Sequence, residues 1–171
     1  MTSIRPAKIE DAPLLAEMGK LSFLESHGHS ASKEDMDQYV SEKYTEDVFI
    51  NELKEEQNIY HIIYAENKPA GYSKILLNAS HQNVEALNVT KLERFYLLKE
   101  FYGMKLGQEL FHYNISLSKK NNQAGMWLFV WKENTRAIKF YRSAGFEIIG
   151  SHDFKISENH SNPNHQMFLK F

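Results

Sequence analysis

The sequence predicts an α/β (α+β) domain built on a mixed β-sheet that is flanked by helices. Short apolar runs rich in β-branched and aromatic residues alternate with segments of helical period. The 171 residues fall in the size range of one compact domain, and 42% of them are hydrophobic and 25% charged. Since no internal repeat or linker interrupts this pattern, we expect a single domain over residues 1–171.

The expected elements follow the order strand, three helices, three strands, helix, strand, helix and two strands. Each boundary rests on a change of period, a helix-capping residue or a turn residue. The expected strands are residues 3–7, 59–65, 71–77, 91–98, 126–131, 146–150 and 165–169. The expected helices are residues 10–25, 33–43, 45–55, 106–118 and 134–143.

The first helix carries an apolar stripe. Leu14, Met18 and Leu21 recur at helical spacing and are expected to face the core. Glu25 continues the same stripe, which predicts that its carboxylate points inward from the end of the helix.

Charge and composition exclude several classes of function. A net charge of −2 and a pI near 6.4 argue against a nucleic-acid binder with a basic face. The absence of cysteine excludes a disulfide framework, a thiolate zinc site and a cysteine nucleophile. The N-terminus lacks the apolar run of a signal peptide, and no stretch is apolar over membrane-spanning length. We therefore expect a cytoplasmic protein without a membrane partner; a homodimer is compatible with the sequence.

The segment from Asn134 to Phe146, N-T-R-A-I-K-F-Y-R-S-A-G-F, is the clearest motif. Taken alone, its Tyr141 could be a core aromatic residue with a satisfied hydroxyl. The whole run, however, resembles the segment that closes the acyl-CoA site in the GNAT superfamily of N-acetyltransferases. The resemblance implies a GNAT fold, in which the strands 91–98 and 126–131 splay apart, and acetyl-CoA as cosubstrate with no metal.

The same resemblance implies roles within the motif. In direct transfer, an amine attacks the acetyl thioester and a CoA thiolate leaves. A phenol beside the sulfur can protonate that thiolate, because an alkyl thiol has a pKa of about 8.5 and a phenol one of about 10. Tyr141 matches the position of this acid. Asn134 matches the position that binds the pantetheine arm of CoA or a loop beside it.

The loop that leads into the helix 106–118 corresponds to the pyrophosphate-binding loop of the family, which offers backbone N–H groups at a helix N-terminus. Only Gly107 matches the family pattern in type, because Tyr102 stands where Gln or Arg is usual and a lysine, Lys105, stands where the first glycine is usual. A positive φ at that lysine would be strained, whereas its ammonium could bind phosphate. The residues of the expected loop are Tyr102, Gly103, Met104, Lys105, Leu106 and Gly107.

The strand L-E-R-F-Y-L, residues 92–97, precedes this loop. In the family, pantetheine pairs with this strand, so we expect backbone contacts to CoA from Phe95, Tyr96 and Leu97, including an N–H that stabilises the thioester oxygen. Glu93 is the preferred general base, since a protonated amine must lose a proton before attack. The alternatives for Glu93 are an ion pair with Arg94 or a solvated strand position.

Over nearly its whole length the sequence resembles PaiA-type polyamine N-acetyltransferases, which implies spermidine or spermine as acceptor. In this fold the acceptor cleft lies near the first two helices, where Glu25 is the one acidic residue expected to face a bound amine. His61 is an alternative base or a satisfied histidine of the sheet. His27 and His29 lack a carboxylate at ligand spacing, so no metal site is expected.

Two other functions remain open at this stage. The acceptor could be a protein or peptide N-terminus or another small amine. The altered loop at Tyr102–Gly107 could instead belong to a non-catalytic module that senses acyl-CoA.

Overall fold

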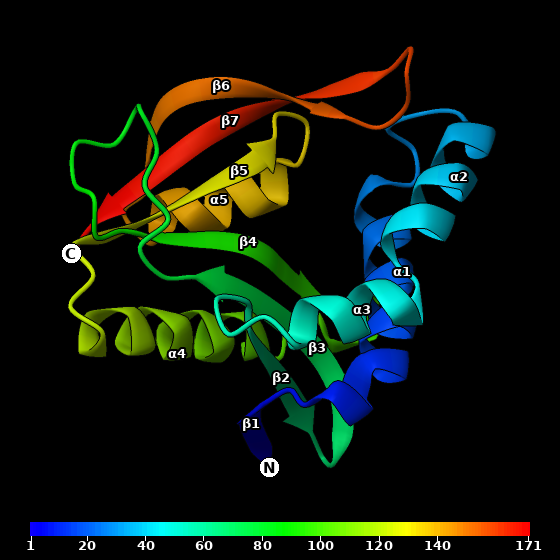
Figure 1. Cartoon of the computed structure of the whole chain (residues 1–171), viewed down its shortest axis with the longest axis horizontal. Coiled ribbons are helices and arrows are strands. Elements are labelled where there is room, and N and C mark those ends of the chain that lie inside the picture. The colour runs from blue at the N-terminus through cyan, green and yellow to red at the C-terminus, as the bar shows by residue number, and fades with distance from the viewer. The chain divides into compact units, whose positions relative to one another are not determined.

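A computed structural model describes all residues of the chain, 1–171 (Figure 1). The strands are β1 (Thr2–Pro6), β2 (Ile59–Ala65), β3 (Lys68–Leu76), β4 (Thr90–Leu97), β5 (Gly125–Trp131), β6 (Glu147–Lys155) and β7 (Ser161–Lys170). The helices are η1 (Ile9–Asp11), α1 (Ala12–His27), α2 (Lys33–Lys43), α3 (Glu46–Leu53), η2 (Lys99–Phe101), α4 (Leu106–Lys120) and α5 (Thr135–Ser143). None of these helices combines the length and apolar character needed to cross a membrane.

The seven strands form one mixed sheet in the order β1-β2-β3-β4-β5-β7-β6. Strands β4 and β5 are parallel, and their register consists of Thr90 opposite Met126 and Lys91 opposite Trp127. Leu92 and Glu93 have no partner in β5, so the two strands part after Lys91. The predicted mixed sheet with a splayed strand pair is therefore confirmed.

The chain divides into two compact units. Unit 1 contains residues 1–75 and 94–114, and unit 2 contains residues 76–93 and 115–171. In unit 1, one face of β2 and β3 packs on α4 through a buried cluster that includes Ile63, Ala70, Leu106 and Leu110. Apolar side chains at helical spacing on α4 form this contact, as the sequence predicts.

The buried face of α1 differs from the predicted stripe. Met18 is buried as expected, but Leu21 is 48% exposed, and the face that packs inward contains Leu15, Gly19 and Ser22 instead. The small residue Gly19 makes close packing possible here, because an added Cβ would lie 2.7 Å from the Tyr44 ring. A pattern based on large apolar residues overlooks a face built partly from glycine and serine. Glu25, which the sequence predicts to continue the stripe inward, is exposed.

In unit 2, a long loop between β3 and β4 covers part of the sheet. Val84 and Val89 of this loop pack against Trp127 of β5, and the Trp127 indole Nε1 donates a hydrogen bond to the Ala79 carbonyl at 2.7 Å. The loop is held at its start as well, because the Gln123 side chain bonds both the backbone N–H and the side chain of Asn78, each at 2.9 Å.

The last two strands are longer than predicted. The sequence indicated strands over residues 146–150 and 165–169, whereas β6 and β7 pair from Glu147–Phe168 to Lys155–Ser161. Figure 1 shows them as one long hairpin, in orange and red. The added residues are mostly polar, so they lack the apolar alternation that identifies a strand from sequence.

A buried histidine lies between β2 and α4 in unit 1. The ring of His61 packs edge-on against Tyr113 at 4.7 Å, and its Nδ1 has no hydrogen-bond partner. Burial lowers the pKa of His61 to about 4 and that of His27, at the end of α1, also to about 4. A role for His61 as an alternative base is disfavoured, because a group with a pKa of about 4 is a weak base. The other expectation, a histidine of the sheet with all its hydrogen bonds made, is wrong because Nδ1 has no partner.

These two histidines should make folding sensitive to mild acid. Their folded-state pKa values lie below the ordinary value of 6.5, so the unfolded chain takes up protons as the pH falls through 6.5 while the folded chain does not. Stability is therefore lost between about pH 6.5 and pH 4. From pH 7 to pH 5, urea unfolding should show a loss of roughly 1–2 kcal/mol per histidine. His61→Phe should reduce this loss, whereas replacing the exposed His112 by Gln should leave it as in the wild type.

Candidate functional site

The loop before α4 adopts a conformation that favours glycine at two positions. Gly103 has φ of +84°, and Lys105 has φ of +61°, in the left-handed region. The strain predicted for Lys105 if its φ were positive is thus present. The Lys105 carbonyl accepts hydrogen bonds from the N–H groups of Gln108 and Glu109, at 3.0 and 3.2 Å, so this residue starts the helix.

The N-terminus of α4 can hold an anion. The N–H groups of Leu106 and Gly107 belong to the first turn, where a helix offers no carbonyl partner, and α4 is fifteen residues long. Tyr102, Met104 and Lys105 are exposed around this turn. Backbone N–H groups, the helix dipole and one ammonium group are a combination suited to a phosphate.

Strand β4 lies next to this loop in unit 1. A Cβ added to Gly107 would lie 3.2 Å from a methyl of Leu97, so the loop and the end of the strand touch. The Leu98 N–H donates to the Ala70 carbonyl at 2.9 Å, toward β3. Because successive N–H groups of an extended strand point in opposite directions, the Leu97 N–H points away from β3. Phe95 and Tyr96 are half-buried; Tyr96 packs against Tyr72 and Phe95 against Phe111.

The predicted motif of unit 2 folds as a capped helix. Asn134 is the N-cap of α5, and its Oδ1 accepts a hydrogen bond from the Ala137 N–H at 3.2 Å. Tyr141 is buried near the end of α5, between the rings of Phe140 and Phe146 at 5.5 Å each. Gly145, with φ of +100°, ends the helix. Since Oδ1 of Asn134 is used by the cap, Nδ2 is the side-chain atom that remains for a ligand.

Glu93 stands at the point where β4 leaves β5. Its carboxylate lies 3.5 Å from the Lys91 ammonium, which in turn lies over the rings of Trp127 and Phe129 at 5.2 and 5.6 Å. Arg94 pairs with another carboxylate, Glu52, at 3.6 Å, and the alternative of a Glu93–Arg94 pair stays a prediction.

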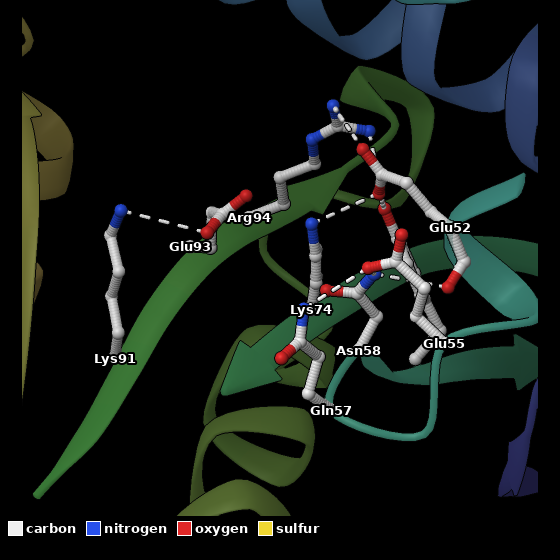
Figure 2. A network of polar contacts seen from close by, with 9 residues as sticks. Glu52, Glu55, Gln57, Asn58, Lys74, Lys91, Glu93 and Arg94 are labelled. Atoms are coloured by element: carbon white, nitrogen blue, oxygen red, sulfur yellow. Dashed lines mark hydrogen bonds and ion pairs between the residues drawn. The ribbon is translucent and has the colours of Figure 1, made fainter. Parts of the chain in front are cut away.

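A partly buried network of charges in unit 1 joins helix α3 to three strands (Figure 2). Glu52 lies at its centre. Its Oε2 is 3.0 Å from the Lys74 Nζ and also accepts a short hydrogen bond from the Tyr60 hydroxyl, and its Oε1 is 3.6 Å from an Arg94 nitrogen. The Arg94 guanidinium lies 5.2 Å from the ring centres of both Tyr44 and Phe49.

Electrostatics keep this network charged. Burial by itself would raise the pKa of Glu52, but the charge of Arg94 and hydrogen bonds from Tyr60 and Lys74 hold it below its ordinary value. Burial raises the pKa values of Tyr60 and Tyr72, so both phenols stay neutral. The network fixes α3 on the strands beside β4. The sequence does not predict the network, because Glu52, Lys74 and Arg94 are far apart along the chain. The apolar neighbours of Lys74 and Arg94 are the only sequence feature that indicates burial at these positions.

Glu25 and His27, at the end of α1, make structural contacts. The Glu25 carboxylate accepts a hydrogen bond from the Lys99 N–H at 2.9 Å, at the start of η2. The His27 ring stacks on Phe23 at 4.9 Å, and its Nδ1 lies 2.8 Å from the Ser26 hydroxyl. Unit 1 thus brings Glu25 close to the segment between β4 and α4 through its backbone contact.

The chain is similar in sequence to known N-acetyltransferases. A sequence model of the GNAT acetyltransferase family matches residues 24–146. An uncharacterized N-acetyltransferase of Lactobacillus delbrueckii subsp. lactis is 25% identical over 161 residues, 93% of each chain. A spermidine N(1)-acetyltransferase of Thermoplasma acidophilum is 26% identical over 149 residues, which are 85% of this chain and 88% of that one.

Solved structures share the fold. The crystal structure of the PaiA N-acetyltransferase from Thermoplasma acidophilum in complex with coenzyme A aligns with a TM-score of 0.79 at 23% sequence identity. The alignment covers 100% of this chain and 99% of that chain.

Removing the central charge of the Glu52 network should destabilise the protein. Glu52→Gln keeps the shape of the side chain but leaves Arg94 and Lys74 without this carboxylate, which should cost on the order of 3 kcal/mol. Glu55→Gln, an exposed neighbour, should change the free energy of unfolding by less than about 0.5 kcal/mol. Chemical denaturation of both variants measures the difference; equal stabilities would show that the network contributes nothing to folding.

Proposed function

The chain belongs to the GNAT acetyltransferase family, whose cosubstrate is acetyl-CoA, and we propose that it acetylates a primary amine by direct transfer. The observation that carries the proposal is the segment Asn134–Phe146, which has the family motif and folds as a capped helix with Tyr141 buried in it. No covalent enzyme intermediate is required, which agrees with a sequence that has no cysteine.

We assign CoA binding to the residues in the loop and strand of unit 1. The first-turn N–H groups of α4, with the backbone of Tyr102–Gly107, would bind the pyrophosphate, and the Lys105 ammonium would add a charge contact. Phe95, Tyr96 and Leu97 would contact pantetheine through their backbone. The direction of the Leu97 N–H, away from β3, supports a bond to the thioester oxygen, whose negative charge grows during attack.

We assign the proton transfers to two residues of unit 2. Glu93, directly or through water, would take a proton from the incoming ammonium, since an aliphatic amine has a pKa of about 10.4 and must be neutral to attack. The amine nitrogen then forms a bond to the carbonyl carbon, the C–S bond breaks, and the sulfur leaves with the electron pair. The Tyr141 hydroxyl would supply the proton that this thiolate takes up.

A polyamine is the acceptor that we propose. A relative from Thermoplasma acidophilum is a spermidine N(1)-acetyltransferase, which favours a polyamine such as spermidine or spermine. The acidic residue expected to bind a polyamine, Glu25, is exposed and accepts a hydrogen bond from the Lys99 N–H. Because this bond occupies one side of the carboxylate, we propose that Glu25 contributes only partly to substrate binding.

A single domain, a cytoplasmic location and a homodimer stay predictions from the sequence.

Titration with acetyl-CoA tests the cosubstrate first. Millimolar acetyl-CoA should raise the melting temperature of the protein, because a ligand that binds only the folded state stabilises it. No shift would contradict both the enzyme and an acyl-CoA sensor. A shift without thiol release from any amine would identify the sensor.

Loss of the Tyr141 hydroxyl should slow the reaction but preserve binding. We expect Tyr141→Phe to lower kcat about 100-fold, the usual size of a general-acid contribution, while acetyl-CoA stabilises the variant as it does the wild type. Tyr113→Phe, which removes the hydroxyl of a tyrosine on α4, is the matched control and should keep full activity. Undiminished kcat in Tyr141→Phe would remove this residue from its assigned role.

Two substitutions of Lys105 separate its charge from its backbone. Lys105→Ala removes the ammonium but keeps a Cβ at positive φ, and Lys105→Gly removes both the ammonium and the strain. If the charge binds phosphate, both variants should bind CoA about fivefold more weakly, since such a contact is worth about 1 kcal/mol. The glycine variant alone should gain stability, up to about 1 kcal/mol. Wild-type affinity in both variants would show that the backbone suffices.

A further inference from the structure

A positive charge lies beside the residue proposed as the base. Lys91 and Glu93 occupy alternate positions of β4, so their side chains leave the same side of the strand. The Lys91 ammonium is 3.5 Å from the Glu93 carboxylate, and Figure 2 shows the two groups directed toward each other. Their side chains are 26% and 30% exposed, so the pair is partly accessible at the point where β4 parts from β5.

The Lys91 ammonium is held in place by two aromatic rings. Lys91 pairs in the sheet with Trp127, and its ammonium lies 5.2 Å from the centre of the Trp127 ring and 5.6 Å from that of Phe129. Trp127 is fixed in turn, because its indole Nε1 donates a hydrogen bond to the Ala79 carbonyl at 2.7 Å. A cation attracted to two anchored rings and to a carboxylate loses much of its freedom to move. Lys91 therefore provides a localised charge.

A carboxylate that serves as the base for an amine has two opposing effects. The acceptor arrives as an ammonium, which must give up a proton before its nitrogen can attack. A carboxylate without a partner accepts this proton but also stabilises the ammonium form, because an opposite charge nearby favours the charged state. A positive charge near the same nitrogen acts in the other direction and favours the neutral amine.

Lys91 is close enough to act on an acceptor nitrogen at Glu93. A nitrogen that donates a hydrogen bond to Glu93 lies about 3 Å from a carboxylate oxygen. The Lys91 ammonium, 3.5 Å from that carboxylate, is then within about 8 Å of the nitrogen, the screening length at physiological ionic strength.

Two histidines share the aromatic rings beside Lys91. The rings of His81 and His152 lie 6.0 Å and 4.4 Å from that of Phe129. Histidine side chains can take up a proton at about pH 5 to 8 and then carry a positive charge. At about pH 8.5 the effect of Lys91 is therefore measured with the least contribution from these histidines.

From this arrangement we infer that Lys91 offsets the charge of Glu93, so that an acceptor nitrogen at this base is favoured in the neutral form that attacks acetyl-CoA. The inference rests on the proposed function. The acceptor ammonium gives its proton to the Glu93 carboxylate, directly or through water, and the nitrogen lone pair then forms the bond to the acetyl carbon. Lys91 forms no bond in this step, and it acts as a positioning residue by destabilising the bound ammonium.

This role has a kinetic signature that a purely structural role does not have. Without the Lys91 charge, the ammonium form of the acceptor should bind more tightly and react more slowly. KM and kcat should therefore fall together, each about tenfold, the lower end of the range for a neighbouring charge because the pair is partly exposed. The ratio kcat/KM should change by less than about threefold, because the free amine is unaffected and the transition state little affected.

Kinetics with spermidine at about pH 8.5 test the inference in four variants. Lys91→Met and Lys91→Gln both remove the charge and should both show the joint fall in kcat and KM. Lys91→Arg keeps a cation that can lie over aromatic rings, so it should retain the wild-type constants. Lys119→Met is the matched control, because the Lys119 ammonium also lies over a ring, that of Phe171 at 5.3 Å, but belongs to the last turn of α4. It should leave both constants unchanged.

The outcomes separate this inference from the proposed function. Stabilisation by acetyl-CoA shows that each variant is folded. If spermidine is not acetylated and another amine is, that amine takes its place. Unchanged constants in both uncharged variants, a fall in kcat/KM with a KM that does not fall, or the same change in Lys91→Arg would overturn the inference alone. Absence of turnover with every amine would overturn the proposed function and this inference with it.

Discussion

Backbone polar groups must be paired, and strand β4 cannot pair with β5 beyond Lys91. Up to that residue the two parallel strands form an ordinary register. After it, the N–H and C=O groups of Leu92 and Glu93 on this side have no strand partner in β5. A strand edge inside a sheet is a place where an extended ligand can bind by hydrogen bonds of the kind that strands make. The pantetheine contacts proposed for residues 95–97 and the role proposed for Glu93 depend on this parting, whereas the proposed phosphate contacts depend on the start of α4.

The partly buried network around Glu52 gives β4 a firm position on its other side. Burying three charged side chains is unfavourable unless they pair, and a well-packed apolar cluster would often be as stable. The charged and hydrogen-bonded pairs constrain the distances and directions between these side chains, and so they fix how the elements that carry them are placed. Helix α3 and strands β2, β3 and β4 each contribute one of the four polar residues, so these elements cannot shift independently.

Most of the fold could be predicted from the sequence, because it depends on local patterns. The helix α5, its Asn134 cap and its end at Gly145 follow from residue types at fixed spacing. The predicted helix face and strand ends differ from the structure where the side chains are small or polar. The inner face of α1 uses Gly19 and Ser22, and the extended ends of β6 and β7 are polar. The Glu52 network could not be predicted either, since its members meet only through the tertiary fold.

Residues that serve the shared reaction and residues that recognise the acceptor differ in how far a sequence motif identifies them. The motif segment Asn134–Phe146 lies within the part of the chain that the GNAT family model matches. Residues that recognise an acceptor need to match only that molecule, so they diverge while the fold is retained.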